Sequence, residues 1–171
     1  MIWWLWAWAA LWAQSPQKGT TGAGMDAWVG VGHSSAVYFA TPYLGAYPLH
    51  RWFVGGKVSV GQAAFRVGND SYLTAGPMTR YYLFSSKITP LVQAGVEYGV
   101  STLGAKGFAA LHLGGGASIA VKHNFALEVV AQYMYFGAKI GPDKRGFDAF
   151  MVGVGFQGWL KKNKKIPKKD K

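Results

Sequence analysis

Four charged side chains stand inside otherwise apolar stretches of this sequence, where they could pair with one another or transfer protons. They are Lys57, Arg80, Glu97 and Glu128, and Gln132 adds a polar amide to a stretch of the same kind. A charge that is enclosed away from water is costly unless it is paired or hydrogen-bonded. We therefore expect these side chains to form a polar network that fills an interior. The functional alternative is a proton or ion path, or a small binding site.

The residue types that commonly hold metals or act as nucleophiles show no such pattern. The chain has no cysteine, and its 4 histidines, His33, His50, His112 and His123, have no spacing typical of a metal site. We expect single histidines in the interior or in turns. The run Gly114-Gly115-Gly116 lacks the following helix and Lys-Ser/Thr of a phosphate loop. The sequence thus predicts no metal site, no cofactor and no catalytic residue.

The stretches that carry these side chains alternate small or polar residues with apolar ones, as a β-strand with two different faces does. In residues 52–61, Trp52, Val54, Val58 and Val60 share one face, and glycine, serine and lysine share the other. A strand between lipid and a packed polar lumen has this pattern. A half-buried strand of a soluble sandwich has it too, so the choice depends on the number of strands, the composition and the chain ends.

Eight segments with this alternation follow one another along the chain. The predicted strands are 27–33, 36–47, 51–66, 72–84, 88–102, 108–121, 125–136 and 147–160. Pro42 removes a ladder donor, which predicts a bulge nearby. The sequence therefore predicts an all-β fold, an eight-stranded antiparallel transmembrane β-barrel that occupies residues 25–160.

The connections between the predicted strands alternate in length. Short ones follow strands two, four and six, at 48–50, 85–87 and 122–124. Longer or more polar ones follow strands three, five and seven, at 66–71, 103–107 and 137–146. Short periplasmic turns and longer outer loops are typical of bacterial outer-membrane barrels, and an even strand number brings both ends to the periplasmic side.

The composition and the first residues agree with this interpretation. Half of the 171 residues are hydrophobic, yet after residue 13 no run approaches the ~18 apolar residues of a membrane-spanning helix. Residues 1–13 are uncharged and apolar and end at Ala13, which predicts a secretory signal peptide. An uncleaved anchor or a buried core segment are the alternatives. We expect residues 14–24, which are polar and rich in glycine, to form a mobile leader.

The last residues, 161–171, carry 7 lysines and 1 aspartate and account for more than half of the net charge of +11. On the periplasmic side such a tail would contact anionic headgroups, peptidoglycan or an acidic periplasmic protein rather than nucleic acid. A solvated tail with no partner is the alternative. The candidate contact residues are Lys161, Lys162, Lys164, Lys165, Lys168 and Lys169.

Three segments, 76–84, 89–99 and 124–128, together resemble the small outer-membrane β-barrel domain proteins common in Bacteroidetes. The resemblance covers about residues 28–160. It implies an eight-stranded barrel in the outer membrane of a Gram-negative bacterium, in contact with lipid and lipopolysaccharide, and no assigned reaction. Barrels of this kind end at an aromatic residue, whereas Phe156 and Trp159 are followed here by the basic tail.

A second, weaker resemblance concerns the loop before the last strand. Residues 134–143 and 146–148 are similar to this region of outer-membrane lipid A 3-O-deacylases, which read His-x-Ser-Asn-Ala-Gly with a carboxylate about a dozen residues on. Met134 and Phe136 stand at the histidine and serine places, and Asp148 could serve as the carboxylate. Methionine and phenylalanine supply neither a base nor a nucleophile. The chain is therefore either a catalytically degenerate relative of this family, or the likeness is that of a generic loop.

Together these features predict a non-enzymatic, monomeric outer-membrane barrel with a structural or interaction role and a lumen closed by packed polar side chains. The alternatives are a barrel related to lipid A deacylases and a soluble carrier similar to lipocalins.

Overall fold

The computed structural model describes Pro16 and residues 18–32, 35–65, 68–102, 107–137 and 147–160. These residues form eight strands. The strands are β1 (Thr21–Gly32), β2 (Ser35–Leu49), β3 (Trp52–Phe65), β4 (Gly68–Tyr82), β5 (Ile88–Ser101), β6 (Phe108–Lys122), β7 (Phe125–Phe136) and β8 (Phe147–Leu160). The described residues include no helix long and apolar enough to cross a membrane. The predicted signal peptide and the basic tail lie outside the described residues.

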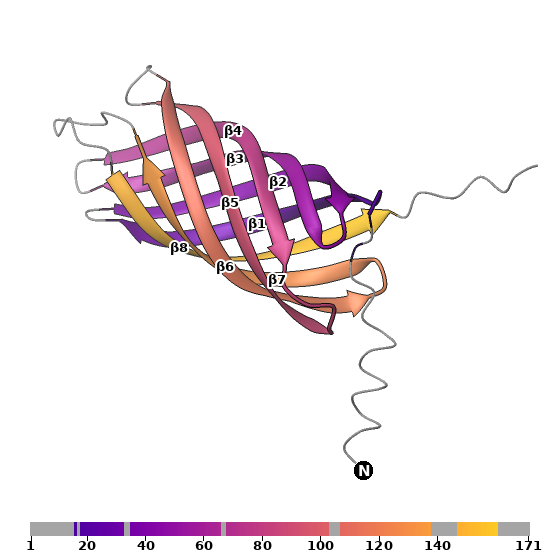
Figure 1. The fold of residues 1–171 in the computed structure, drawn as a ribbon. Coiled ribbons are helices and arrows are strands. Elements are labelled where there is room, and N and C mark those ends of the chain that lie inside the picture. Colours follow the sequence, from indigo (N-terminus) through magenta and orange to yellow (C-terminus); the bar gives the residue numbers. More distant parts are fainter. Residues whose placement is uncertain are drawn as a thin grey trace, which may run out of the picture.

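The strands close into a single antiparallel barrel in which each strand pairs with its sequence neighbours and β1 pairs with β8. The closing pair runs from Thr21 opposite Leu160 to Gly32 opposite Ala149. Figure 1 shows the tilted strands wrapping around the barrel, with the start of β1 and the end of β8 at the same end. We call this the turn end, because the β2–β3, β4–β5 and β6–β7 turns also lie there, and we call the opposite end the loop end.

Burial alternates along every strand, which separates an apolar outer wall from a packed interior. In β3, for example, Val58 and Val60 are exposed, whereas Lys57 and Ser59 are buried. Backbone hydrogen bonds go to the neighbouring strands, so closure leaves no strand edge unpaired. The predicted fold class is therefore confirmed.

The bounds of β7 and β8 agree with the prediction, whereas β1 begins at Thr21 instead of residue 27. Four residues of the predicted leader belong to this strand. The contact with β2 begins even earlier, because Gly19 N donates to Tyr47 O at 2.8 Å and Tyr47 N donates to Thr20 O at 2.9 Å. Gly22 and Gly24 suggested a loop, but each lies beneath a tyrosine ring, of Tyr47 and Tyr43 respectively.

The predicted connection at 66–71 is wrong, because β4 begins at Gly68, which pairs with Phe65 of β3. Gly32 and Ser35 likewise face each other at the β1–β2 connection. The predicted longer connections are therefore found between β5 and β6 and between β7 and β8, but not between β3 and β4. Pairing with the neighbouring strand outweighs the turn preference of Gly, Asn and Asp.

At Pro42, where a bulge or local irregularity is expected, the β2–β3 pairing is interrupted between Ala40 and Tyr43 without a bulge. The β2–β3 register is the same on both sides of this residue, from Ala40 opposite Val60 to Tyr43 opposite Lys57. A proline can lose one ladder bond without shifting the register. The irregularity lies further on, between Ala46 and Leu49.

Candidate functional site

The candidate site is the polar interior of the barrel, and its largest fully buried side chain is that of Arg80 in β4. Arg80 is 0% exposed. Its guanidinium donates from Nη2 to Asp26 of β1 and from Nη1 to Glu128 of β7, forming two ion pairs. Its Nε donates to Gln93 Oε1 of β5 at 2.8 Å. One arginine therefore links four strands across the lumen.

Aromatic hydroxyls complete the shell around this group. Arg80 Nη1 donates to the Tyr43 hydroxyl at 2.7 Å, and the Arg80 Cζ lies 4.4 Å from the centroid of the Tyr43 ring, in a cation–π contact. The Tyr82 hydroxyl donates to Glu128 Oε1 at 2.9 Å and also donates to Gln157. We call Arg80 and its partners the arginine cluster; its members are Asp26, Tyr43, Arg80, Tyr82, Gln93, Glu128 and Gln157.

A second cluster centres on Glu97 of β5. Lys57 Nζ of β3 forms an ion pair with Glu97 Oε1 at 2.6 Å, and His112 Nδ1 of β6 lies 3.4 Å from the same oxygen. The Ser59 hydroxyl donates to Glu97 Oε2 at 3.0 Å, and Thr74 donates to that oxygen as well. We call this group the lysine cluster.

Glycines make room for the lysine cluster. Gly76 lies opposite Lys57 in the β3–β4 register. A Cβ on Gly76 would lie 1.9 Å from Val96 O and 2.8 Å from Glu97 Cα. A Cβ on Gly95 would lie 2.3 Å from the His112 ring. The absence of these two side chains lets the polar groups of β3, β5 and β6 meet across the lumen.

Gln132 extends the polar interior toward β7 and β8. Gln93 Nε2 donates to Gln132 Oε1 at 2.8 Å, which joins Gln132 to the arginine cluster. All five predicted network residues are thus buried and bonded, but in two clusters rather than one. Arg80 pairs with Glu128, and Glu97 pairs with Lys57. Arg80 faces Gln93 in the β4–β5 register, and Glu97 lies four residues, or about 13 Å, further along β5.

Sequence reasoning missed several members of the network. Asp26 fell outside the predicted first strand, although it stands two residues before Trp28 and shares its buried face. His112 was predicted to be a single histidine, yet it contacts both Lys57 and Glu97. Tyr43 and Tyr82 have inward parity in their strands, and this parity was the available signal.

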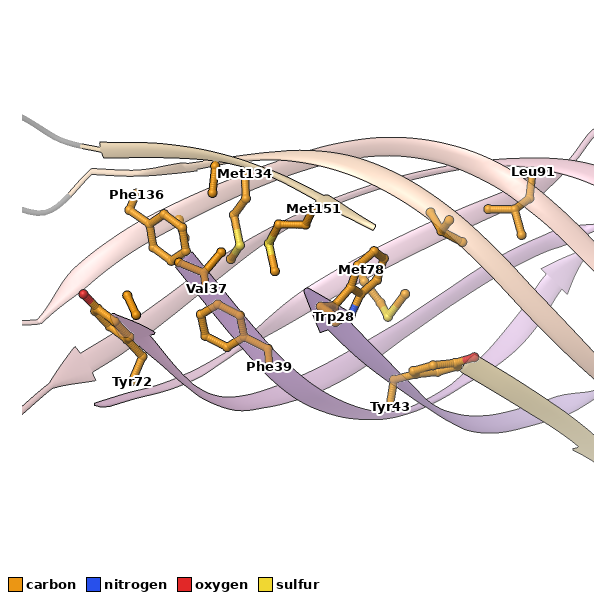
Figure 2. Packing of buried hydrophobic residues seen from close by; sticks show 14 of the residues in the cluster. Trp28, Val37, Phe39, Tyr43, Tyr72, Met78, Leu91, Met134, Phe136 and Met151 are labelled. Carbon is orange, nitrogen blue, oxygen red and sulfur yellow. The ribbon is translucent and has the colours of Figure 1, made fainter. Parts of the chain in front are cut away.

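Apolar side chains fill the rest of the interior. Figure 2 shows Phe39, Tyr72, Phe136 and Val37 gathered toward the loop end, with Met134 and Met151 beside them. Phe136 stacks on Phe39, with ring centroids 6.2 Å apart. Tyr72 meets the Phe108 ring edge-on at 5.7 Å. Packing of this kind holds the polar clusters in a dry environment, where ion pairs are stronger than in water.

The positions that resembled deacylase residues do not converge. Met134 and Phe136 point into the barrel and are buried, whereas Asp148 lies exposed on the outer wall. There the Tyr133 hydroxyl donates to Asp148 Oδ2 at 2.8 Å. Within the described residues no group of three His, Asp or Glu side chains could hold a metal ion. The polar side chains of the described interior form ion pairs and hydrogen bonds with one another.

Solved structures share this architecture. Neisserial surface protein A is 15% identical and superposes with a TM-score of 0.60 over 81% of this chain and 95% of its own. The fold is that of a small outer-membrane β-barrel. The outer membrane enzyme PagL, 15% identical, gives a TM-score of 0.59 over 77% of this chain and 97% of its own. Outer membrane protein OprG from Pseudomonas aeruginosa is 12% identical and gives a TM-score of 0.58 over 87% of this chain and 99% of its own.

No protein-family model matches the sequence, and no curated protein sequence matches it. The more specific resemblance to the Bacteroidetes barrels stays a prediction.

Proposed function

We propose that this protein is an integral outer-membrane barrel of a Gram-negative bacterium with a structural or interaction role. The observation that carries the proposal is the outer wall, where all eight strands expose large apolar side chains. One example from each strand is Val29, Leu44, Val60, Leu73, Val96, Leu113, Val129 and Val154. Soluble proteins rarely expose an apolar surface of this extent, whereas lipid covers it without cost.

We further propose that the lumen is closed and conducts nothing. An eight-stranded barrel has an interior just wide enough for side chains to fill. Arg80, Glu97, Glu128, Tyr47 and Phe53 are among the largest side chains buried there. Their mutual bonds would have to break before an ion could pass. The barrel would work as a monomer, in contact with lipid and lipopolysaccharide.

The signal-like residues 1–13 and the fold shared with outer-membrane proteins support this location. The turn end would then face the periplasm, and the lysines of residues 161–171 would leave the barrel there. Their partners would be anionic headgroups, peptidoglycan or an acidic periplasmic protein.

The alternative, an acyl hydrolase related to PagL, has little support beyond the shared fold. Met134 and Phe136 lie inside the barrel, and Asp148 lies outside with Tyr133 as its partner. A hydrolase needs its nucleophile and base within hydrogen-bond reach. We expect reconstituted protein to release no acyl chains from lipid A. Release that is abolished by Asp148→Ala would overturn the non-enzymatic proposal.

Cell fractionation combined with gel migration tests the location. The protein should sediment with the outer membrane, require detergent for extraction, and migrate differently before and after boiling, because the closed barrel resists unfolding in detergent. A soluble carrier would be released without detergent and would show no heat-dependent migration. That result would refute the membrane proposal.

A further inference from the structure

A groove of about 630 Å³ indents the outer wall near the turn end, within the ~300–1,000 Å³ range of small-molecule sites. Its centre is a row of paired residues that crosses five strands. The row runs from Leu44 through Ala23, Gly158 and Phe125 to Lys122. Ala23 and Gly158 form a low floor between the larger side chains of Leu44 and Phe125, so the groove is narrow and apolar.

Two features fix the sides of this groove. The Phe125 ring stacks on Phe156 with centroids 6.0 Å apart, which holds Phe125 upright beside the floor. The β6–β7 register shifts between Ala120 and Lys122. This irregularity interrupts the alternation, so that Val121 and Lys122 are both exposed. A cation therefore stands at the edge of an apolar groove.

The surroundings of the groove favour an anionic ligand. Lys18, Arg51, Lys87 and Lys122 all lie at the turn end. Four carboxylates of the described residues, those of Asp26, Asp70, Glu97 and Glu128, are buried, and the exposed Asp148 lies at the loop end, where β8 begins. No exposed carboxylate in the described part of the chain competes for these cations.

We propose that the groove binds one phospholipid with an anionic headgroup, from the leaflet that meets the turn end. An acyl chain lies between Leu44 and Phe125 over the floor of Ala23 and Gly158, and the phosphate meets the Lys122 ammonium. The inference rests on the proposed membrane location, which puts this wall in contact with acyl chains and the adjoining rim at headgroup level. The apolar lining and the cation match the two halves of such a lipid.

Native mass spectrometry of the full chain in detergent micelles tests this inference. The micelles are titrated with phosphatidylglycerol or with phosphatidylcholine of the same acyl chains. We expect one phosphatidylglycerol to bind in preference to phosphatidylcholine. Lys122→Ser should weaken phosphatidylglycerol binding about fivefold, the effect of one lysine at an anionic surface. It should weaken phosphatidylcholine binding less, because the choline ammonium of that lipid offsets the charge of its phosphate.

Filling the groove should weaken binding of both lipids. Gly158→Leu suits this purpose, because the nearest atoms to an added Cβ are Asn124 O at 3.8 Å and Ala23 O at 3.9 Å, so the barrel can accept the side chain. Gly56→Leu is the matched control, since a Cβ on Gly56 meets nothing within 4 Å. Gly56 pairs with Leu44 on the side away from Ala23 and does not line the groove. Lys87→Ser, at a turn outside the groove, is the control for charge.

Equal binding of the two lipids, or binding that neither Lys122→Ser nor Gly158→Leu weakens, would overturn the inference. A dimer that binds no lipid would also overturn the inference, because a second copy of the chain would then occupy the groove. Heat-dependent migration of each variant establishes that its barrel is closed. Fractionation separates the two proposals: a protein absent from the outer membrane refutes the location, whereas a protein in that membrane without lipid preference refutes only the lipid site.

Discussion

At Arg80 a single guanidinium compensates two buried carboxylates, those of Asp26 and Glu128. Replacing it would leave both charges enclosed and would remove the donor to Gln93. Nearby hydroxyls cannot substitute, because Tyr43 and Tyr82 carry no charge. Arg80 is therefore the residue on which the arginine cluster depends.

We expect Arg80→Met to lower the free energy of unfolding by about 3–5 kcal/mol, the cost of breaking a buried ion pair on one side. Urea titration in micelles, followed by gel migration, measures the change. Asp26→Asn should cost less, because Glu128 still pairs with Arg80. If Arg80→Met and the unaltered chain were equally stable, the arginine cluster would contribute little to the free energy of unfolding.

At the scale of the strand, glycine placement decides where polar groups can meet. We expect Gly76→Ala to destabilise the barrel by about 1–3 kcal/mol, because its Cβ would overlap Val96 O of the neighbouring strand. Gly56→Ala in β3 should change stability by less than about 0.5 kcal/mol, since it adds a methyl group to open space. The same urea titration compares the two variants, and equal effects would contradict the packing described for Gly76.

The exposed side chains of the outer wall lead to a second prediction, on the cost of placing a charge there. Val58 is 43% exposed in the middle of β3, and Leu49 is 50% exposed at the turn end of β2. Val58→Arg should destabilise the membrane-inserted barrel by about 2–4 kcal/mol, and Leu49→Arg by about 0–1 kcal/mol, because the cost of a charge falls toward the interface. Refolding yields into lipid vesicles measure the difference. Equal yields would show that lipid does not cover this wall.

The alternation of residue types predicted the eight-stranded barrel and, in residues 52–61, which side chains are exposed and which are buried. It did not predict which charges pair, because pairing depends on register, and register follows from strand ends that the sequence marks poorly. The early start of β1 illustrates this. Gly22 and Gly24 look like loop residues until the rings of Tyr47 and Tyr43 are placed over them. Asp26 was missed for the same reason.

At the scale of the molecule, the inter-strand pairing of the described residues extends from Thr21 to Leu160. We therefore expect deletion of residues 161–171 to leave assembly and heat-dependent migration unchanged. Substituting the tail lysines with serine provides the control for length. If the deletion variant fails to form the closed barrel and the serine variant forms it, the tail helps β8 to assemble.

The pairing of β1 with β8 also governs the order of events in biogenesis. The chain has no finished barrel until its last strand has been made and brought to its first, and contacts so distant in sequence form slowly. Before β8 pairs with β1, the apolar side chains of the outer wall have no partner surface within the chain. We therefore expect the newly made polypeptide to be prone to aggregation until β8 has paired with β1, because its apolar side chains and strand edges are exposed before closure.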